Sequence, residues 1–440
     1  MHKIKTNVFM LITLCISLTT IVIFSGCAGS NDGSEEFIYC VSVASGGSHG
    51  DDDSNFPSIN ADGRYVAFRS DATYLVAGDT NGVQDIFIHD TQTVTTTRVS
   101  VNSSGAQSNN GSNLSSINAD GRYVAFESWA SNLVTGDNNL VQDIFVHDTQ
   151  TGTTTRVSVD SEGAEDIVNS NNPSISADGR YVAFDSGATN LVTGDTNGVY
   201  DIFLHDTQTG TTTRVSVDSV GAQGNGNSNN PSISSDGRYV AFHSYSNLVA
   251  GDTNGVLDIF IHDTQTGTTA RVSVDSNGTQ GDGDSFYPSI SADGRYVAFV
   301  SAATNLVAGD TNGMMDIFLH DTQTGTTARV SVDSEGAEGN GSSNFNPSIS
   351  SDGRYVAFES AATNLVPGDT NGVEDIFIHD TQTGTTTRVS VDSNGTQGDG
   401  KSSALSISAD GRYVAFESLA SNLVAFDYNV SWDVFRVLNK

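Results

Sequence analysis

Cysteine is scarce in this 440-residue sequence, which contains only three. Two of them, Cys15 and Cys27, lie in an N-terminal stretch that has the features of an export signal, so Cys40 has no partner for an internal disulfide bond. One remaining cysteine is also too few for a metal site built from cysteines. We therefore expect Cys40 to pack as a small apolar residue.

Basic residues are also few, with 19 Lys and Arg against 52 Asp and Glu and a formal net charge of −33. This sign argues against nucleic acid and anionic lipid surfaces as partners. The acidic residues form no tail or single patch, because a sequence repeat spreads them along the chain. Turns and strand ends use aspartate for backbone hydrogen bonds, which explains much of the charge.

Helical periodicity is absent from the repeats, and what the sequence contains instead is one recurring unit. The stretch Asp62–Phe68 reads DGRYVAF. It recurs intact with its first residue at Asp120, Asp178, Asp236, Asp293, Asp352 and Asp410. Seven copies at a nearly constant spacing indicate a repeat architecture, which is a solenoid, an array or a propeller.

Each unit predicts four short strands. In the first copy they cover residues 57–60, 64–68, 85–89 and 96–101. Asp62 and Gly63 fit a two-residue type I′ turn between the first two strands. The second strand is almost wholly apolar, as in a strand covered on both faces, whereas the fourth alternates between apolar and polar residues. We label the strands a to d and predict an antiparallel sheet for each copy.

Seven four-stranded antiparallel sheets with buried inner strands predict an all-β fold, a seven-bladed β-propeller over residues 37–440. The seventh copy ends after its third strand, at 432–437. The missing fourth strand is present at the other end of the chain, because residues 37–43 match strand d and Cys40 falls where Arg98 does. We therefore predict that an N-terminal closing strand, 37–44, completes the last blade and leaves no open edge.

The N-terminus predicts export from the cytoplasm. Lys3 and Lys5 precede an apolar run over 8–24, as in a signal peptide. Residues 23–27, IFSGC, resemble the lipobox of bacterial lipoproteins, which implies a signal peptide over 1–26 and a lipid on Cys27. Residues 27–36 then form a short tether to a membrane, on the periplasmic or cell-surface side. A plain signal peptide with an incidental cysteine is the alternative.

The Asp-Gly turn, the Val-Ala-Phe strand and the Asp-Ile-Phe strand at 85–87 resemble the WD-repeat-like propeller repeats of the TolB type, over about residues 37–437. This resemblance implies the fold. It implies little about function, because such propellers occur in periplasmic binding proteins and also in front of peptidase domains. The chain lacks the N-terminal α/β domain of TolB, so TolB's own partners are not carried over.

The connection between strands b and c contains the residues that most resemble a metal-binding motif. Residues 79–85 read Asp-x-Asn-Gly-x-x-Asp, which looks like the later part of the calcium loops of EF-hands and integrin-type propellers. Ala77 stands where a first ligand is expected; the alternative is a set of Asx turns. The candidate calcium ligands are Asp79, Asn81, Asp85, Asp137, Asn139, Asp143, Asp195, Asn197, Asp201, Asp252, Asn254, Asp258, Asp310, Asn312, Asp316, Asp369, Asn371, Asp375, Asp427, Asn429 and Asp433.

Two further residue types recur once in each of six copies. Histidines end strand c, and we expect them to form hydrogen bonds within the blade; they are His89, His147, His205, His262, His320 and His379. Arginines lie on strand d, and we expect them to pair with nearby carboxylates; they are Arg98, Arg156, Arg214, Arg271, Arg329 and Arg388.

The strand order places the b–c and d–a connections on one face of the ring, and we predict that this face binds a partner. The favoured function is a monomeric, non-catalytic envelope lipoprotein whose propeller binds a protein or a glycan. Nearly identical blades argue against catalysis, which needs asymmetry. The alternatives are a propeller enzyme acting on glycans, a lyase or a hydrolase, and a structural envelope protein stabilised by calcium.

Overall fold

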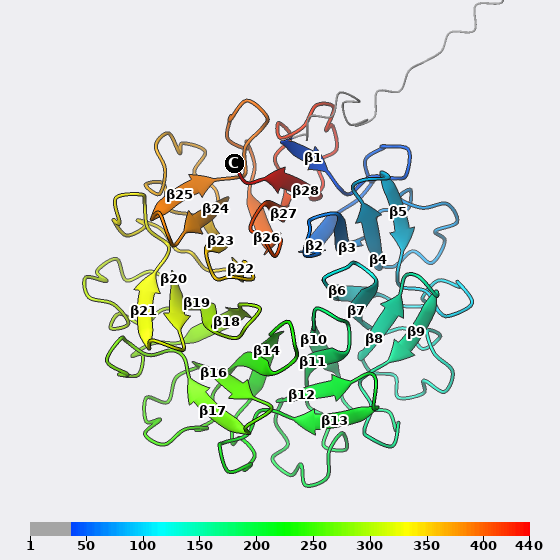
Figure 1. Cartoon of the computed structure of the whole chain (residues 1–440). Coiled ribbons are helices and arrows are strands. Elements are labelled where there is room, and N and C mark those ends of the chain that lie inside the picture. The colour runs from blue at the N-terminus through cyan, green and yellow to red at the C-terminus, as the bar shows by residue number, and fades with distance from the viewer. Residues whose placement is uncertain (1–36) are drawn as a thin grey trace, which may run out of the picture.

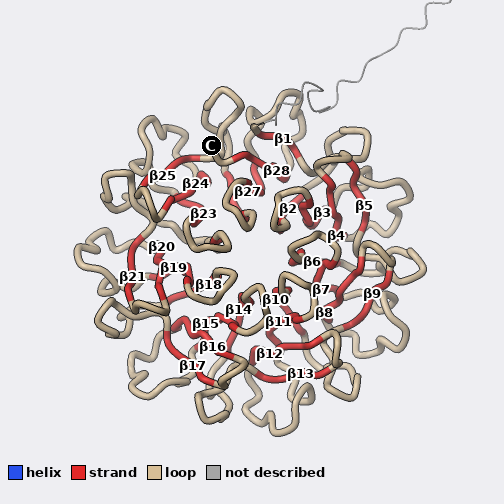
Figure 2. The backbone as a smooth tube through the Cα atoms, viewed as in Figure 1, coloured by secondary structure: helices blue, strands red, loops and turns tan. Residues whose placement is uncertain are grey.

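The computed structural model describes residues 37–440, which form seven four-stranded antiparallel sheets around a central axis (Figure 1). These residues contain strands and loops and no helix (Figure 2). None of the described segments is therefore a helix long and apolar enough to cross a bilayer. The predicted signal peptide, lipid-bearing Cys27 and tether lie outside the described residues. The predicted all-β, seven-bladed propeller is confirmed.

The first blade consists of β2 (Ser54–Ile59), β3 (Tyr65–Ser70), β4 (Asp85–Asp90) and β5 (Thr95–Arg98), ordered from the axis outward. The next three blades are β6 (Ser112–Ile117), β7 (Tyr123–Ser128), β8 (Asp143–Asp148), β9 (Thr153–Arg156); β10 (Ser170–Ile175), β11 (Tyr181–Ser186), β12 (Asp201–Asp206), β13 (Thr211–Arg214); and β14 (Ser228–Ile233), β15 (Tyr239–Ser244), β16 (Asp258–Asp263), β17 (Thr268–Arg271). The fifth and sixth are β18 (Ser285–Ile290), β19 (Tyr296–Ser301), β20 (Asp316–Asp321), β21 (Thr326–Arg329); and β22 (Ser348–Ile349), β23 (Tyr355–Ser360), β24 (Asp375–Asp380), β25 (Thr385–Arg388).

The seventh blade combines the two ends of the described chain. Its strands are β26 (Ser402–Ile407), β27 (Tyr413–Ser418), β28 (Asp433–Leu438) and the N-terminal β1 (Ile38–Cys40), which pairs antiparallel with β28. Cys40 is opposite Phe435, just as Arg98 is opposite Phe87 in the first blade. The predicted closing strand and its register are confirmed.

The core consists of layers between neighbouring blades. Val66 and Phe68 on β3 pack toward the seventh blade, whereas Ala67 between them packs toward the second. All three side chains are fully buried. Phe68 stacks on Phe87 of β4, with ring centroids 6.0 Å apart. Strand b is therefore covered on both faces, which explains its nearly continuous apolar sequence.

The turns between strands a and b link the blades into a closed cycle. Ala61 N donates to Ala119 O at 3.2 Å, and equivalent bonds pass from blade to blade until Ala409 N donates to Ala61 O at 3.0 Å. The predicted type I′ turn is wrong, because Gly63 has a φ of 75° but Asp62 is not among the residues with positive φ. Gly63 N instead donates to Asn60 O, which closes a turn one residue earlier.

The glycine of this turn contacts the preceding blade in the ring. A Cβ atom added to Gly121 would lie 2.3 Å from the ring of Tyr65, so only glycine allows the blades to approach this closely. Arg64 stacks over the same tyrosine ring, 4.7 Å from its centroid, and leaves the ring little room to move. The DGRY sequence is therefore an interblade contact as well as a turn.

We expect Gly121→Ala to destabilise the protein by about 2 kcal/mol more than Gly136→Ala. Both glycines have positive φ, 77° and 84°, so both substitutions strain the backbone, but a Cβ at Gly136 meets no atom within 4 Å. Urea unfolding of the two variants measures the difference. Equal destabilisation would show that the tyrosine contact does not constrain this position.

Candidate functional site

The predicted calcium-loop residues form a compact polar cluster with the arginine of strand d. In the first blade, Asn81 donates to the Oδ2 atom of Asp85 at 2.9 Å, and the hydroxyl of Ser100 donates to Oδ1. The guanidinium of Arg98 lies 3.5 Å from Asp85 and 3.3 Å from Asp79. Asp85 is fully buried, and its carboxylate is neutralised by an arginine of the same blade.

The same arrangement recurs in five more blades. The arginine lies 3.1–3.4 Å from the loop aspartate and 3.2–3.5 Å from the aspartate that begins strand c. The five equivalent clusters consist of Arg156 with Asp137 and Asp143, Arg214 with Asp195 and Asp201, Arg271 with Asp252 and Asp258, Arg329 with Asp310 and Asp316, and Arg388 with Asp369 and Asp375.

These six clusters do not fit calcium. The guanidinium occupies the space between the two carboxylates, and Ca²⁺ needs six to eight oxygen ligands. The asparagine of each loop uses its amide nitrogen on the strand aspartate, as Asn254 does toward Asp258 at 3.0 Å. Its Oδ1 atom accepts from the backbone two residues on, the Asx arrangement named as the alternative, as at Asn254 and Val256.

The predicted roles of the recurring arginines and histidines are confirmed. The arginines pair with local carboxylates, as described above. His89 shares a hydrogen bond with the Thr96 hydroxyl at 2.9 Å, and the threonine in turn bonds to the carbonyl of Val43 in the neighbouring blade. Burial lowers the pKa of His89 to about 4, so the ring is neutral at physiological pH. Equivalent His–Thr pairs hold the outer strands of five further blades.

The seventh blade departs from this pattern, because Cys40 stands where the other blades have arginine. Asp427 and Asp433 therefore have no guanidinium beside them, and His49 takes the place that Gln107 holds in the first blade. Asn429 donates to the carbonyl of Gly50 at 3.2 Å. Burial and the charge of Asp433 raise the pKa of Asp427 to about 6, and the same two causes raise that of the Cys40 thiol to about 12.

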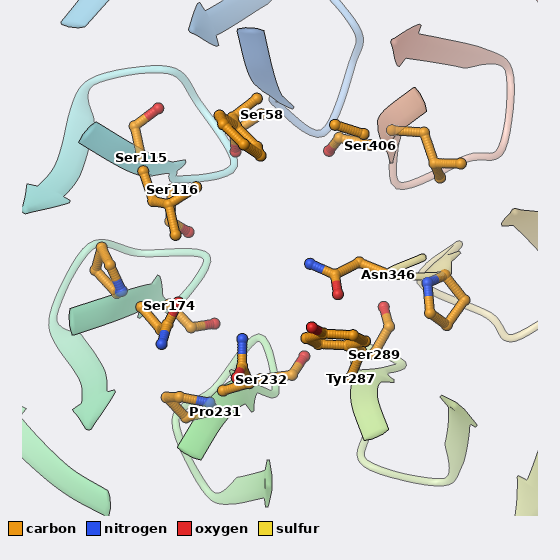
Figure 3. A pocket seen from close by; sticks show the side chains of 18 of the residues that line it. Ser58, Ser115, Ser116, Ser174, Pro231, Ser232, Tyr287, Ser289, Asn346 and Ser406 are labelled. Carbon is orange, nitrogen blue, oxygen red and sulfur yellow. The ribbon is translucent and has the colours of Figure 1, made fainter. Parts of the chain in front are cut away.

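A second site lies on the axis, where residues in or just before strand a of every blade line a pocket of about 240 Å³ (Figure 3). Its wall contains a ring of serines whose hydroxyl oxygens accept backbone N–H groups of the following blade, as Ser58 accepts from Ile117 at 3.1 Å. Each hydroxyl keeps its own hydrogen for donation. The other ring members that line the pocket are Ser116, Ser174, Ser232, Ser289 and Ser406, and Ser348 completes the cycle of hydrogen bonds without lining the pocket.

The wall of this axial pocket is strained. Phe56, Asn172, Asn230, Tyr287 and Ala404 have φ between 36° and 54°, in the left-handed region that favours glycine. These residues lie at β-bulges where the pairing of strands a and b shifts. Such backbone costs about 1–3 kcal/mol per residue and persists only where neighbouring groups hold it. Bulges of this kind re-aim side chains and are frequent beside functional sites.

Buried polar side chains from the preceding blade hold four of these bulges. Glu417 accepts the Phe56 N–H at 2.8 Å, Glu127 accepts the Asn172 N–H at 3.0 Å, and Asp185 accepts the Asn230 N–H at 3.1 Å. His243 accepts the Tyr287 N–H through Nδ1 at 3.4 Å. Burial raises the pKa of Glu127 and Glu417 to about 7 and that of Asp185 to about 6, and lowers that of His243 to about 4.

Sequence reasoning missed this ring of supporting groups. All occupy the one variable position of strand b, directly after Val-Ala-Phe, which holds Arg69, Glu127, Asp185, His243, Val300, Glu359 and Glu417 in the seven blades. A polar or charged residue at the same place in six copies of an otherwise apolar strand is the signal that could have revealed it. These supporting side chains lie near the face that carries the b–c and d–a loops, because each is the second-to-last residue of strand b.

Comparison with known proteins shows that this chain shares the β-propeller fold with solved structures. No protein-family model and no curated protein matches the sequence. Among solved structures, the chain is similar to oligogalacturonate lyase from Vibrio parahaemolyticus (12% identity, 92% of this chain and 94% of that chain, TM-score 0.54). It is also similar to the β-propeller domain of the Trilobed protease from Pyrococcus furiosus (12% identity, 83% and 91%, TM-score 0.50).

TolB from Acinetobacter baumannii is among the similar structures (18% identity, 77% of this chain, TM-score 0.43). This chain spans 63% of that protein, less than two thirds of its length. All of these identities are below 25%, so the likenesses describe the propeller and leave the activity of this chain open.

We expect the buried carboxyl groups behind the axial pocket to make stability depend on pH. The folded state raises the pKa of Glu127 and Glu417 from 4.5 to about 7, so their stabilising contribution is complete below pH 4.5 and is lost as pH rises through 7. Each group accounts for about 2.5 kcal/mol between pH 5 and pH 8, so the Glu127→Gln/Glu417→Gln variant should gain about 5 kcal/mol relative to the parent protein over this range.

Denaturant unfolding of parent and variant at both pH values gives this difference. Glu162→Gln, which removes an exposed glutamate, serves as the control for loss of surface charge. A difference between parent and double variant that does not change with pH would contradict the expectation.

Proposed function

We propose that this propeller is a non-catalytic binding protein that takes a hydroxyl-rich ligand, the end or a short segment of a glycan, at its axial pocket and on the adjoining loop face. The observation that carries the proposal is the chemistry of the pocket wall. Serine hydroxyls with a hydrogen left to donate surround the axis, and they match the oxygen acceptors of a sugar.

The pocket is asymmetric in spite of the repeats, which gives a ligand an orientation. Tyr287 stacks on Phe345 with ring centroids 6.4 Å apart, and both line the pocket on the side of the fifth and sixth blades. Asn172, Asn230 and Asn346 supply amide groups elsewhere on the wall. A flat aromatic surface beside hydrogen-bonding groups suits a sugar ring, which has an apolar face and polar edges.

Binding is favoured over catalysis by the position of the titratable groups. Among the described residues that line the axial pocket, Tyr287 is the one acid or base; the others are serine, proline, asparagine and apolar residues. Glu127, Asp185 and Glu417 lie behind this wall and use oxygens to hold its backbone. General acid–base chemistry requires contact with the substrate, which such groups would reach only if the wall moved.

The raised pKa values of these three carboxyl groups favour one second candidate, an enzyme acting on glycans. Perturbed carboxyls near a pocket are frequent in active sites. The fold itself does not decide between the two candidates, because similar propellers include an oligogalacturonate lyase and parts of peptidases.

The loop face extends the proposed binding surface. Gln107 of a d–a connection donates to the Thr80 hydroxyl of a b–c connection at 2.8 Å, so the two sets of loops form one surface. The Gly- and Asp-rich connections, such as 281–284, give this surface acidic groups that a protein partner could also contact. We place the chain outside the cytoplasm, tethered through Cys27 as a monomer, on the pattern of residues 1–36.

We expect Tyr287→Ala to weaken binding of a glycan found by array screening by about tenfold or more, because the stacking surface is lost. Tyr287→Phe should keep most of the affinity. Gln208→Ala, on an exposed c–d turn of the opposite face, is the matched control and should leave affinity unchanged.

Calorimetric titration of the three variants measures these affinities. Loss of binding with Gln208→Ala but not with Tyr287→Ala would move the binding site to the opposite face. Cleavage of the bound glycan by the parent protein would support the enzyme and contradict the proposal.

A further inference from the structure

The two ends of the described chain meet in the seventh blade, where β1 pairs with β28, and we call this junction the seam of the ring. It brings together three residue types that bind metals. Cys40 is the last residue of β1, His49 follows in the first d–a connection, and Asp433 begins β28. One ligand atom from each residue, a thiol sulfur, a ring nitrogen and a carboxylate oxygen, lies within 4.8 Å of the other two. This is the one such group among residues 37–440.

The carboxylate of Asp433 lacks the partners that its equivalents have. In the first blade, the Oδ2 atom of Asp85 accepts from Asn81 and faces Arg98. In the seventh blade, the arginine is replaced by Cys40, and Asn429 donates to Gly50 O. The Oδ2 atom of Asp433 is consequently buried without a hydrogen-bond donor, in a side chain that is 0% exposed, and the Nδ1 atom of His49 lies 3.9 Å from it. A buried carboxylate oxygen that accepts no hydrogen bond is costly unless a cation is beside it.

We propose that Cys40, His49 and Asp433 bind a single zinc ion that clasps the two chain ends at the seam of the propeller. Thiolate, imidazole and carboxylate together suit zinc, whereas calcium takes oxygen ligands. The ion takes over the role of the arginine that six blades use and the seventh lacks.

The geometry needs only small adjustments to accept this ion. Tetrahedral zinc with bonds of 2.0–2.3 Å sets its ligand atoms about 3.3–3.8 Å apart. The Sγ atom of Cys40 is 3.9 Å from one carboxylate oxygen of Asp433, and the Nδ1 atom of His49 is 3.9 Å from the other. The hydroxyl of Ser42 donates to Oδ1 of Asp433 at 2.5 Å and orients the carboxylate, as outer-shell groups do in metal sites.

Solvent reaches the site through His49, whose side chain is 18% exposed, so an ion has a path of entry. The three side chains leave the fourth position of a tetrahedral ion open for a water molecule. The ligands come from residues 40, 49 and 433, so the ion cross-links strands that are almost four hundred positions apart in the sequence.

The test is titration of the full-length protein, purified without a metal-binding tag, with Co²⁺ as a spectroscopic probe and with Zn²⁺. We expect about one ion per chain, a thiolate-to-cobalt charge-transfer band, and a higher melting temperature with Zn²⁺. Millimolar Ca²⁺ should leave the melting temperature unchanged. Cys40→Ser should remove the band and weaken binding by more than about 100-fold, beyond the effect of losing an outer-shell partner.

A double variant, Cys40→Arg with His49→Gln, gives the seventh blade the equivalents of Arg98 and Gln107 in the first blade. It allows the proposal to be tested even if Cys40→Ser folds poorly. This double variant should fold, bind no zinc, and melt at a higher temperature than the metal-free parent. His205→Gln, which removes a histidine bonded to Thr212 in the third blade, is the matched control and should bind like the parent. No thiolate band in the parent, or equal binding by the parent and the double variant, would overturn the proposal.

Discussion

Closure of the ring is the constraint on which the rest of this structure depends. Two cycles of hydrogen bonds run around the axis, one through the a–b turns and one from the Ile N–H groups to the serine ring, and each is complete only when the seventh blade meets the first. That blade is completed by the pairing of β1 with β28, which covers only residues 38–40 and 435–437. The interactions at this seam therefore decide whether the whole ring holds together.

The repeated blade places one buried aspartate at the start of strand c, and six copies neutralise it in the same way. Arginine on strand d supplies the charge, asparagine in the b–c loop supplies a hydrogen bond, and serine after strand d supplies another. The closing strand keeps the serine, as Ser42, and lacks the arginine. The seventh blade thus has the same carboxylates with a different set of neighbours, and the proposed zinc ion restores the missing positive charge where the ring is joined.

The sequence was sufficient to predict the seven blades, the closing strand and its register, because turn residues and apolar strands repeat with a fixed spacing. The Asp-x-Asn loops predict calcium ligands, but the spacing of oxygen atoms in the sequence does not reveal that Arg98 and its equivalents lie beside these carboxylates in six blades. Two sites were missed for a different reason. Cys40, His49 and Asp433 become neighbours only through ring closure, and the groups behind the axial pocket act on the backbone of the next blade. Both depend on contacts between blades, which a single repeat does not contain.

The most direct test of metal binding at the junction of β1 and β28 is anomalous diffraction from crystals of the zinc-treated protein, with data collected on both sides of the zinc absorption edge. We predict one anomalous peak, between the Cys40 sulfur, His49 and the Asp433 carboxylate, and no peak beside the arginine of any other blade. Seven equivalent peaks would instead make the loops a repeated metal site. No peak at the seam, with β1 still paired to β28, would show that the ring closes without a metal ion.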